Sequence, residues 1–289
     1  MAKVTFFCKT LPFWHVLNRL IQTTMTMQLL LATFVLLIDH QMSQEIKILK
    51  FPRIDSTNLL AQKMLAEHSI ESDTVIWTLN QFGGRGQREN RWEVEPGQNL
   101  TFSLVFFPEQ LAVNQQFSLS EATALGVLDA ISSLIDAKEL TIKWPNDIYL
   151  GAKKVGGLLL EHSIMGAVIN TSVIGIGINI NQRIFPANLP NPTSLALESD
   201  KEFDLEELLE VTIQHLFSRY AMLDEHKIAS LHEEYRYSLF RKEGYHTFET
   251  DKGRFTAKIA DVKRSGELIL EVVNGDQAAY AFKEVSYVL

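Results

Sequence analysis

The stretch GGRGQRENRW, residues 83–92, combines three glycines with three arginines in a chain that is acidic overall. Glycine lets the backbone approach a ligand closely. Arg85, Arg88 and Arg91 can donate charge-assisted hydrogen bonds to a phosphate. The GxxxxGK[ST] pattern of a P-loop is absent. We interpret this stretch as a loop that binds a small anion, although a solvated turn with ordinary arginines explains the same residues equally well.

A second polar group interrupts an apolar stretch at KWPNDIYL, residues 143–150. Pro145 cannot donate to a β-ladder, so we expect Lys143, Asn146 and Asp147 at a break between buried flanks. A cation, an amide and a carboxylate at such a break suit a nucleotide and its Mg²⁺. A plain turn over a buried tryptophan is the alternative, and for this motif alone it is the stronger one.

Three further motifs could contribute ligand contacts. KKVGGLLLE, residues 153–161, brings two lysines into an apolar strand that contains a glycine pair, and a lysine there can bind a carboxylate or a phosphate. GIGININ, residues 175–181, has alternating glycines next to Asn179. DSTN, residues 55–58, can cap a helix, and a helix N-terminus also binds polar ligands. Solvated hairpin lysines, close packing beneath a helix and a simple cap are the respective alternatives.

The elements that must position these motifs follow from hydrophobic periodicity. The predicted strands are residues 46–51, 74–79, 99–106, 141–150, 155–162 and 167–180. We expect a helix capped by Asp55 or Ser56 after the first strand, and a long amphipathic helix over residues 204–223. Ser118 and Glu121 have capping-box spacing, which predicts that another helix begins there. The main body is therefore α+β.

The C-terminal part differs from this body. Short alternating runs are joined by Ser265-Gly266 and Asn274-Gly275, which are typical of hairpin turns. We predict a small all-β domain there. The predicted parts of the chain are an apolar N-terminal extension over residues 1–42, an α+β body over residues 43–238 and the β domain over residues 239–289.

Composition limits the possible functions. The chain has 289 residues, a formal net charge of -8 and 46% hydrophobic residues, which is enough to bury a core. The acidic net charge argues against general nucleic-acid binding, so we interpret the basic stretch as a local site for a small anion. Cys8 is the single cysteine, so no internal disulfide can form. No cluster has metal-ligand spacing, but an Mg²⁺ carried by a nucleotide would leave little trace in the sequence.

The N-terminal residues do not match the rest. MQLLLATFVLLI, residues 27–38, is an apolar run that is short for a membrane span, which needs roughly 20 residues. We expect residues 1–42 to lie outside the fold, with the functional chain starting at or near Met42 and no membrane association.

Taken in order, DSTN, GRGQ, KWPND, KKVGG and GIGININ resemble the biotin protein ligases, which attach biotin to carboxylase carrier proteins. The resemblance covers about residues 46–235, and NPTSL at residues 191–195 also looks like the family. It implies a mixed sheet with packed helices, like that of class II tRNA synthetases, and a small SH3-like C-terminal domain. It also implies two steps: biotin and MgATP give biotinoyl-AMP, which then biotinylates a lysine of a biotin carboxyl carrier protein.

The resemblance assigns roles to particular residues. Ser56, Thr57, Asn58 and Gln81 would contact the biotin ring and ureido group. The catalytic residues would be Lys154, Arg85 and Asp147, with Lys154 holding the biotin carboxylate and the α-phosphate and Asp147 the candidate contact for nucleotide-bound Mg²⁺. The remaining implied ligand contacts are Gly84, Gly86, Gln87, Arg88, Lys143, Asn146, Gly156, Gly157 and Asn179.

Two positions depart from the family pattern. Gln87 stands where an arginine is common, and Glu89 stands where a glycine is usual. A glutamine brings no charge, and Glu89 adds a negative charge close to phosphates. We therefore predict weaker retention of the adenylate than in relatives.

Several alternatives stay open. A biotin-responsive DNA-binding repressor needs a helix-turn-helix domain ahead of the body, and the 54 residues before Asp55 are apolar rather than basic. A lipoate–protein ligase shares the fold, but KWPND and GRGQ favour biotin. A nucleotide-binding regulator with a dead site is disfavoured by the presence of Lys154 and Asp147. The resemblance further implies a cytoplasmic protein, a carrier-protein partner, no nucleic-acid partner, and a monomer or weak homodimer.

Overall fold

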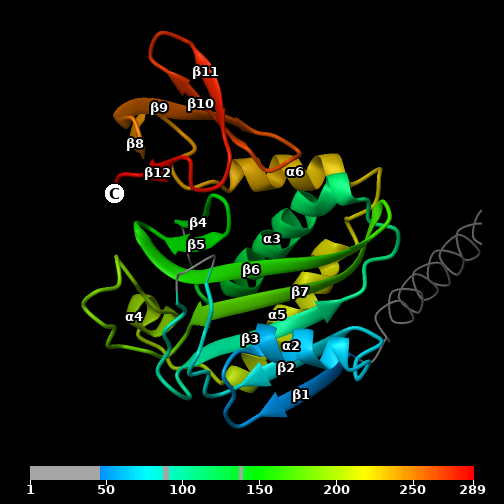
Figure 1. The fold of residues 1–289 in the computed structure, drawn as a ribbon. Helices are drawn as coiled ribbons and strands as arrows, with labels where there is room; N and C mark the ends of the chain where they lie inside the picture. The colour runs from blue at the N-terminus through cyan, green and yellow to red at the C-terminus, as the bar shows by residue number, and fades with distance from the viewer. Residues whose placement is uncertain (1–45, 87–90, 137–138) are drawn as a thin grey trace, which may run out of the picture. The chain divides into compact units, whose positions relative to one another are not determined.

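The computed structural model describes residues 46–86, 91–136 and 139–289. This part of the chain forms a seven-stranded sheet in the order β1-β2-β3-β7-β6-β5-β4 and a five-stranded sheet in the order β11-β10-β9-β8-β12 (Figure 1). The hypothesis about residues 1–42 falls outside the described residues and stays a prediction. The same holds for Gln87, Arg88 and Glu89.

The large sheet is mixed, as predicted. Its strands are β1 (Lys47–Phe51), β2 (Thr74–Thr78), β3 (Asn99–Phe106), β4 (Leu140–Lys143), β5 (Asp147–Leu150), β6 (Lys153–Met165) and β7 (Val168–Asn179). β1 and β2 are parallel, and every other neighbouring pair is antiparallel. The predicted single strand over residues 141–150 is a hairpin of β4 and β5, because the chain turns around Pro145 and pairs Lys143 with Asp147.

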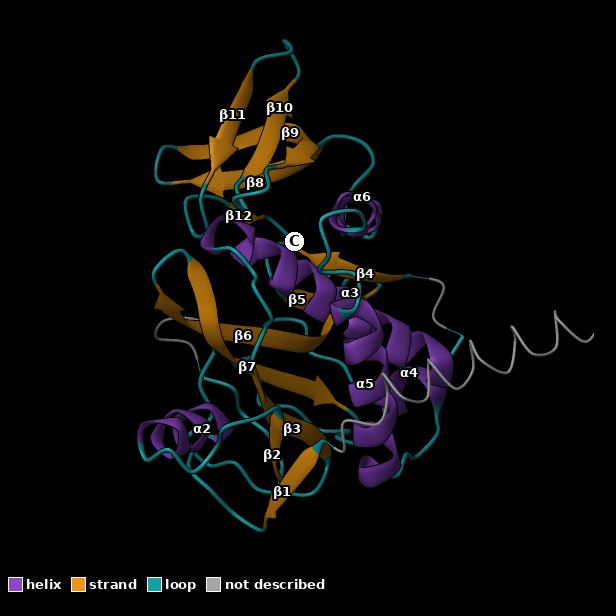
Figure 2. Ribbon diagram, turned by 90° about the vertical axis from the view of Figure 1, so that its right-hand side faces the viewer, coloured by secondary structure: helices purple, strands orange, loops and turns teal. Residues whose placement is uncertain are grey.

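Helices cover both faces of this sheet (Figure 2). They are α2 (Thr57–Ala66), the 3-10 turn η1 (Val113–Gln115), α3 (Gln116–Leu134), α4 (Leu195–Ser199), α5 (Leu205–Tyr220) and α6 (Ile228–Tyr237). α2 packs on one face, where Ala61 joins a buried cluster with Ile76 and Val173. α3 and α5 pack on each other and on the opposite face. No helix among residues 46–86, 91–136 and 139–289 is long and apolar enough to span a bilayer.

The prediction that a helix begins at Ser118 is wrong. α3 begins two residues earlier, at Gln116, and the Ser118 side chain is buried within the helix. Glu121 does not cap anything: its carboxylate is buried, and Oε1 lies 2.5 Å from Nδ1 of His232 in α6. Glu121 has the spacing of a capping residue, but it contacts His232, which is 111 residues away in the sequence, instead of the helix N-terminus.

The small sheet confirms the predicted all-β C-terminal part. Its strands are β8 (His246–Thr250), β9 (Gly253–Val262), β10 (Leu268–Val272), β11 (Gln277–Tyr280) and β12 (Ser286–Tyr287). Gly266 and Gly275 have φ angles of 96° and 93° in the β9–β10 and β10–β11 turns, a region that favours glycine. Leu239 still pairs with Ile142 of the large sheet, and the domain boundary between residues 238 and 239 stays a prediction.

Candidate active site

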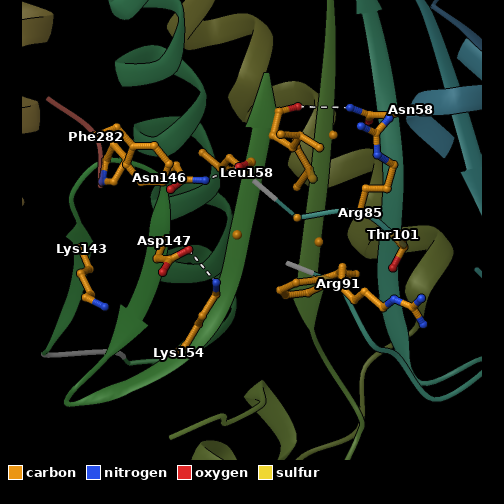
Figure 3. Close-up of a pocket in the computed structure, with 18 of the residues that line it drawn as sticks. Asn58, Arg85, Arg91, Thr101, Lys143, Asn146, Asp147, Lys154, Leu158 and Phe282 are labelled. Atoms are coloured by element: carbon orange, nitrogen blue, oxygen red, sulfur yellow. Dashed lines mark hydrogen bonds and ion pairs between the residues drawn. The ribbon is translucent and has the colours of Figure 1, made fainter. Parts of the chain in front are cut away.

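A cavity of about 500 Å³ lies where the middle of the large sheet meets the C-terminal segment around β12 (Figure 3). Its walls come from the start of α2, the loop after β2, β3, the β4–β5 hairpin, β6, β7 and residues 282–287. This volume is typical of a small-molecule site. DSTN and GIGININ, which are about 120 residues apart in the sequence, therefore line one space together with the motifs between them.

One part of the cavity wall carries four buried polar side chains that are uncharged, those of Ser56, Thr57, Asn58 and Gln81. Ser56 caps α2 by accepting a hydrogen bond from the backbone N–H of Leu59. The cap fixes the first turn of α2, so that Thr57 and Asn58 lie at the cavity wall. Gln81 Oε1 accepts the Thr57 backbone N–H at 2.8 Å. This part of the wall can match a compact group that carries both donors and acceptors.

Another part of the cavity wall carries an ion pair. Lys154 of β6 lies 2.6 Å (Nζ to Oδ1) from Asp147 of β5, and the two side chains are 31% and 24% exposed. Figure 3 shows these two side chains pointing toward each other. Lys143 lies on the adjoining strand, where its Nζ donates to Tyr149 Oη at 3.2 Å. Burial lowers the pKa of Lys143 from its ordinary value, although nearby Asp147 acts in the opposite direction.

The backbone of Lys154 is held on both sides. Its N–H donates to the Asn191 carbonyl at 2.8 Å, and its carbonyl accepts the Thr193 N–H at 2.8 Å. Asn179 in turn donates its side-chain amide to the Thr193 carbonyl at 2.9 Å. The NPTSL stretch thus fixes the position of the lysine, and Asn179 contacts that stretch rather than the cavity.

The KWPND hairpin is anchored to two different parts of the protein. Asn146 donates its side-chain amide to the Leu158 carbonyl of β6, so the amide nitrogen is already engaged. The Trp144 ring is buried, and its Nε1 donates to the Gly266 carbonyl of the small sheet at 2.9 Å. The turn that carries the cavity residues is therefore tied to both sheets.

Trp92, at the end of the basic stretch, lies across the cavity floor. Its backbone N–H donates to the Gly84 carbonyl at 3.0 Å. Its ring occupies the space that a Cβ at Gly177 would need, which explains a glycine there. Lys154 Nζ lies 5.7 Å from the ring centroid, within the range of a cation–π contact.

The structure brings most of the predicted site residues together. Those that line the cavity are Ser56, Thr57, Asn58, Gln81, Arg85, Gly86, Lys143, Asn146, Asp147, Lys154 and Gly157. Gly84, Gly156 and Asn179 do not line it. Gly84 packs against Trp92 and Gln81, Gly156 against Gly177, and Asn179 supports residue 193. Gln87 and Arg88 lie outside the described residues.

Sequence reasoning missed several lining residues. They are Trp92, Thr101, Lys283 and Tyr287. Trp92 belongs to the quoted basic stretch, so the sequence could have indicated it, and Arg91, which the sequence did indicate as a phosphate contact, also lines the cavity. Nothing local marks Lys283 or Tyr287, because only the packing of the small sheet brings them to the cavity.

Comparisons with known proteins agree with this geometry. The model of the biotin/lipoate A/B protein ligase family matches residues 50–179. A biotin–[acetyl-CoA-carboxylase] ligase of Paracoccus denitrificans is 35% identical over 188 residues, which are 62% of this chain and 75% of the relative. A bifunctional ligase/repressor BirA of Bacillus spizizenii is 28% identical over 234 residues, 79% of this chain and 70% of the relative.

The fold has counterparts among solved structures. The biotin protein ligase from Aquifex aeolicus in complex with biotin and ATP superposes with a TM-score of 0.69 at 23% identity, over 83% of this chain and 97% of that one. At this identity the likeness shows the fold. Together with the match to the ligase of Paracoccus denitrificans, it defines the class as a biotin or lipoate ligase fold. Within that class, the chain belongs to the biotin protein ligase family.

Proposed function

We propose that this chain is an ATP-dependent ligase that activates biotin as biotinoyl-AMP and transfers it to a lysine of a biotin carboxyl carrier protein. One observation carries the proposal: a single cavity joins the buried polar side chains of Thr57, Asn58 and Gln81 to the charged side chain of Lys154. Biotin has a ureido group at one end and a carboxylate at the other, so these two parts of the cavity wall match the two ends of the molecule.

The charged part of the cavity wall supports the first step. A biotin carboxylate oxygen attacks the α-phosphorus of ATP, a new P–O bond forms, and the bond to pyrophosphate breaks. Lys154 stabilises both the attacking carboxylate and the α-phosphate, whose charge shifts in the transition state. The nucleophile is already an anion, so positioning and charge neutralisation dominate over proton transfer.

The second step consumes the anhydride. The amine of the carrier lysine attacks the biotinoyl carbonyl, an amide bond forms, AMP leaves, and the amine loses a proton. Asp147 is the carboxylate that lines the described part of the cavity. We expect it to orient the amine once Lys154, its ion-pair partner, shifts to the phosphate. Asp147→Asn is expected to slow this transfer more than it slows adenylation, as measured by separate half-reaction assays.

ATP and its Mg²⁺ complete the proposed set of ligands. Among the described residues, no group of three or more His, Cys, Asp or Glu could hold a metal ion by itself. The described lining of the cavity offers one carboxylate, Asp147. One carboxylate fits an ion that arrives with the nucleotide, since Mg²⁺ is commonly held by one carboxylate together with substrate phosphates. We assign Asp147 as that carboxylate and Lys143 as a phosphate contact.

The deciding experiment is ATP–pyrophosphate exchange with biotin, lipoate or no acid, on the full chain and on a chain beginning at Met42. Exchange with biotin alone is the expected result in both. Exchange with lipoate instead would contradict the proposal and favour a lipoate–protein ligase. Exchange by the full chain alone would contradict the prediction that residues 1–42 are dispensable.

The partner and the location remain predictions. Transfer of labelled biotin to a purified carrier domain tests the partner, and specific binding of operator-like DNA would favour the repressor alternative. Cell fractionation tests the cytoplasmic location, and sedimentation with and without biotin tests the expected monomer or weak homodimer.

A further inference from the structure

Asn58, in the polar part of the cavity wall, has all the hydrogen atoms of its side-chain amide engaged by the protein. Nδ2 donates to Glu161 Oε2 at 2.8 Å and lies 3.4 Å from the Leu159 carbonyl oxygen, both on β6. Oδ1 accepts from the Ser103 hydroxyl at 2.6 Å and packs where a Cβ of Gly175 would lie. The amide is therefore held at both of its ends.

The direction of this amide depends on Glu161. An amide can turn over and exchange its oxygen and nitrogen, and only its neighbours decide between the two directions. The Ser103 hydroxyl does not decide, because a hydroxyl can donate or accept. A carboxylate and a carbonyl can only accept, so Glu161 and Leu159 require Nδ2 on their side. Of these two partners, Glu161 is the nearer to Nδ2 and the charged one.

The Glu161 carboxylate forms a hydrogen bond with Asn58, which is 103 residues away in the sequence. It forms no ion pair within residues 46–86, 91–136 and 139–289. Its outer side lines an open groove beside the end of α2, together with Glu71. A half-exposed carboxylate thus directs a buried amide of the cavity from behind.

We propose that Glu161 is a positioning residue for biotin recognition. By holding Nδ2 of Asn58, it leaves Oδ1 on the side of Gly175, which lines the cavity, with one free lone pair. This oxygen then accepts a hydrogen bond from a ureido N–H of biotin. The role rests on the proposed biotin ligase function and goes beyond it, since Glu161 itself does not line the cavity.

The test compares Glu161→Ala and Glu161→Gln with Glu71→Ala in the full chain. Glu71→Ala is the matched control, because it removes a carboxylate from the same groove without touching Asn58. Biotin-dependent ATP–pyrophosphate exchange gives KM for biotin, KM for ATP and kcat. We expect Glu161→Ala to raise KM for biotin roughly tenfold, with KM for ATP within about twofold, as for loss of one hydrogen bond between biotin and the Asn58 amide. Glu161→Gln keeps an acceptor oxygen and should restore most of the affinity.

A second measurement separates orientation from general packing. Biotin methylated at either of its ureido nitrogens lacks one N–H donor, so one of the two isomers should bind the unaltered chain much more weakly than biotin. In Glu161→Ala the Asn58 amide can turn, and that penalty should shrink severalfold. If Glu161→Ala does not fold, Glu161→Thr carries the same expectation on a residue that favours strands.

Each outcome bears on a different claim. An unchanged KM for biotin and an unchanged methylation penalty in a folded Glu161 variant would overturn its role, while the biotin ligase function would stand. Equal effects of Glu161→Ala on biotin and ATP would also overturn it, because they indicate a structural defect. No biotin-dependent exchange by the unaltered chain would overturn the proposed function itself, and the role of Glu161 with it.

Discussion

Lys154 and Lys153 are adjacent lysines of β6 with different surroundings, and replacing each by glutamine tests the assigned catalytic role. Lys154 lines the cavity and lies 2.6 Å from Asp147 Oδ1. Lys153 pairs with Glu198 on the surface at 3.1 Å and does not line the cavity. Lys153→Gln is therefore the matched control for the loss of one positive charge.

The size of the effect follows from the surroundings of Lys154. Its side chain is 31% exposed, so the effective dielectric constant is well below that of water. A pair of unit charges near a protein surface interacts by about 4 kcal/mol at a separation of roughly 4 Å. Asp147 shares the ammonium in the resting state, so not all of this is available. We expect a loss of about 3 kcal/mol of transition-state stabilisation, or about a hundredfold in kcat.

The assay is biotin-dependent ATP–pyrophosphate exchange at saturating biotin and ATP. Lys154→Gln should lower kcat about a hundredfold and Lys153→Gln less than about twofold. A loss below threefold in a folded Lys154→Gln, or equal losses for both lysines, would refute the assignment.

Three further predictions concern stability and pH. Gly266 and Gly275 both have positive φ, so replacing either by alanine should cost about 1–2 kcal/mol of strain in the folded state. Gly266→Ala should nevertheless lower the free energy of unfolding in urea more than Gly275→Ala does. The difference arises because only the new Cβ at residue 266 meets a neighbour, 2.6 Å from the Phe117 ring; equal losses would contradict this. Burial raises the pKa of Glu121 above 4.5, so the folded state binds its proton more tightly and this group's contribution to stability is lost as pH rises through the raised pKa; Glu121→Gln should flatten the dependence of the urea midpoint on pH. Burial lowers the pKa of Lys143 from 10.5, so KM for ATP should rise on the alkaline side at a lower pH than an ordinary lysine would cause, and a profile unchanged in Lys143→Arg would contradict this.

The periodicity of apolar residues and the residue types at turns predicted most of the fold. The alternation of apolar residues located β3 at Asn99–Phe106, and the glycine turns located the hairpins of the small sheet. These signals are local, since they depend on which residues face a core and which can adopt positive φ. The capping-box prediction at Ser118 failed because Glu121 is used by a distant helix, and no spacing rule contains that information.

The residues of the site also fall into those that the sequence predicts and those that it does not. Motif order was enough to predict the residues whose side chains or backbone face the cavity, such as Lys154 and Asp147. It could not predict residues that act from behind or from the other sheet. Glu161 reaches the cavity only through Asn58, and Lys283 reaches it only because the small sheet packs against the β4–β5 hairpin. Both residues reach the site through tertiary contacts. Glu161 is 103 residues from Asn58 in the sequence, and Lys283 is more than a hundred residues from the β4–β5 hairpin.

The distribution of charge explains how an acidic protein can bind the anions of an adenylation reaction. The whole chain carries a net charge of -8. The described residues that line the cavity include five cations, Arg85, Arg91, Lys143, Lys154 and Lys283, and one carboxylate, Asp147. A concave site lined by one sign of charge concentrates the field that its ligands experience, whatever the net charge of the protein. The described parts of the basic stretch therefore supply two of these cations, Arg85 and Arg91, and the β4–β5 hairpin with β6 and the C-terminal segment carry the remaining three. Raising the salt concentration should therefore weaken ATP binding, even though the net charges of protein and nucleotide have the same sign.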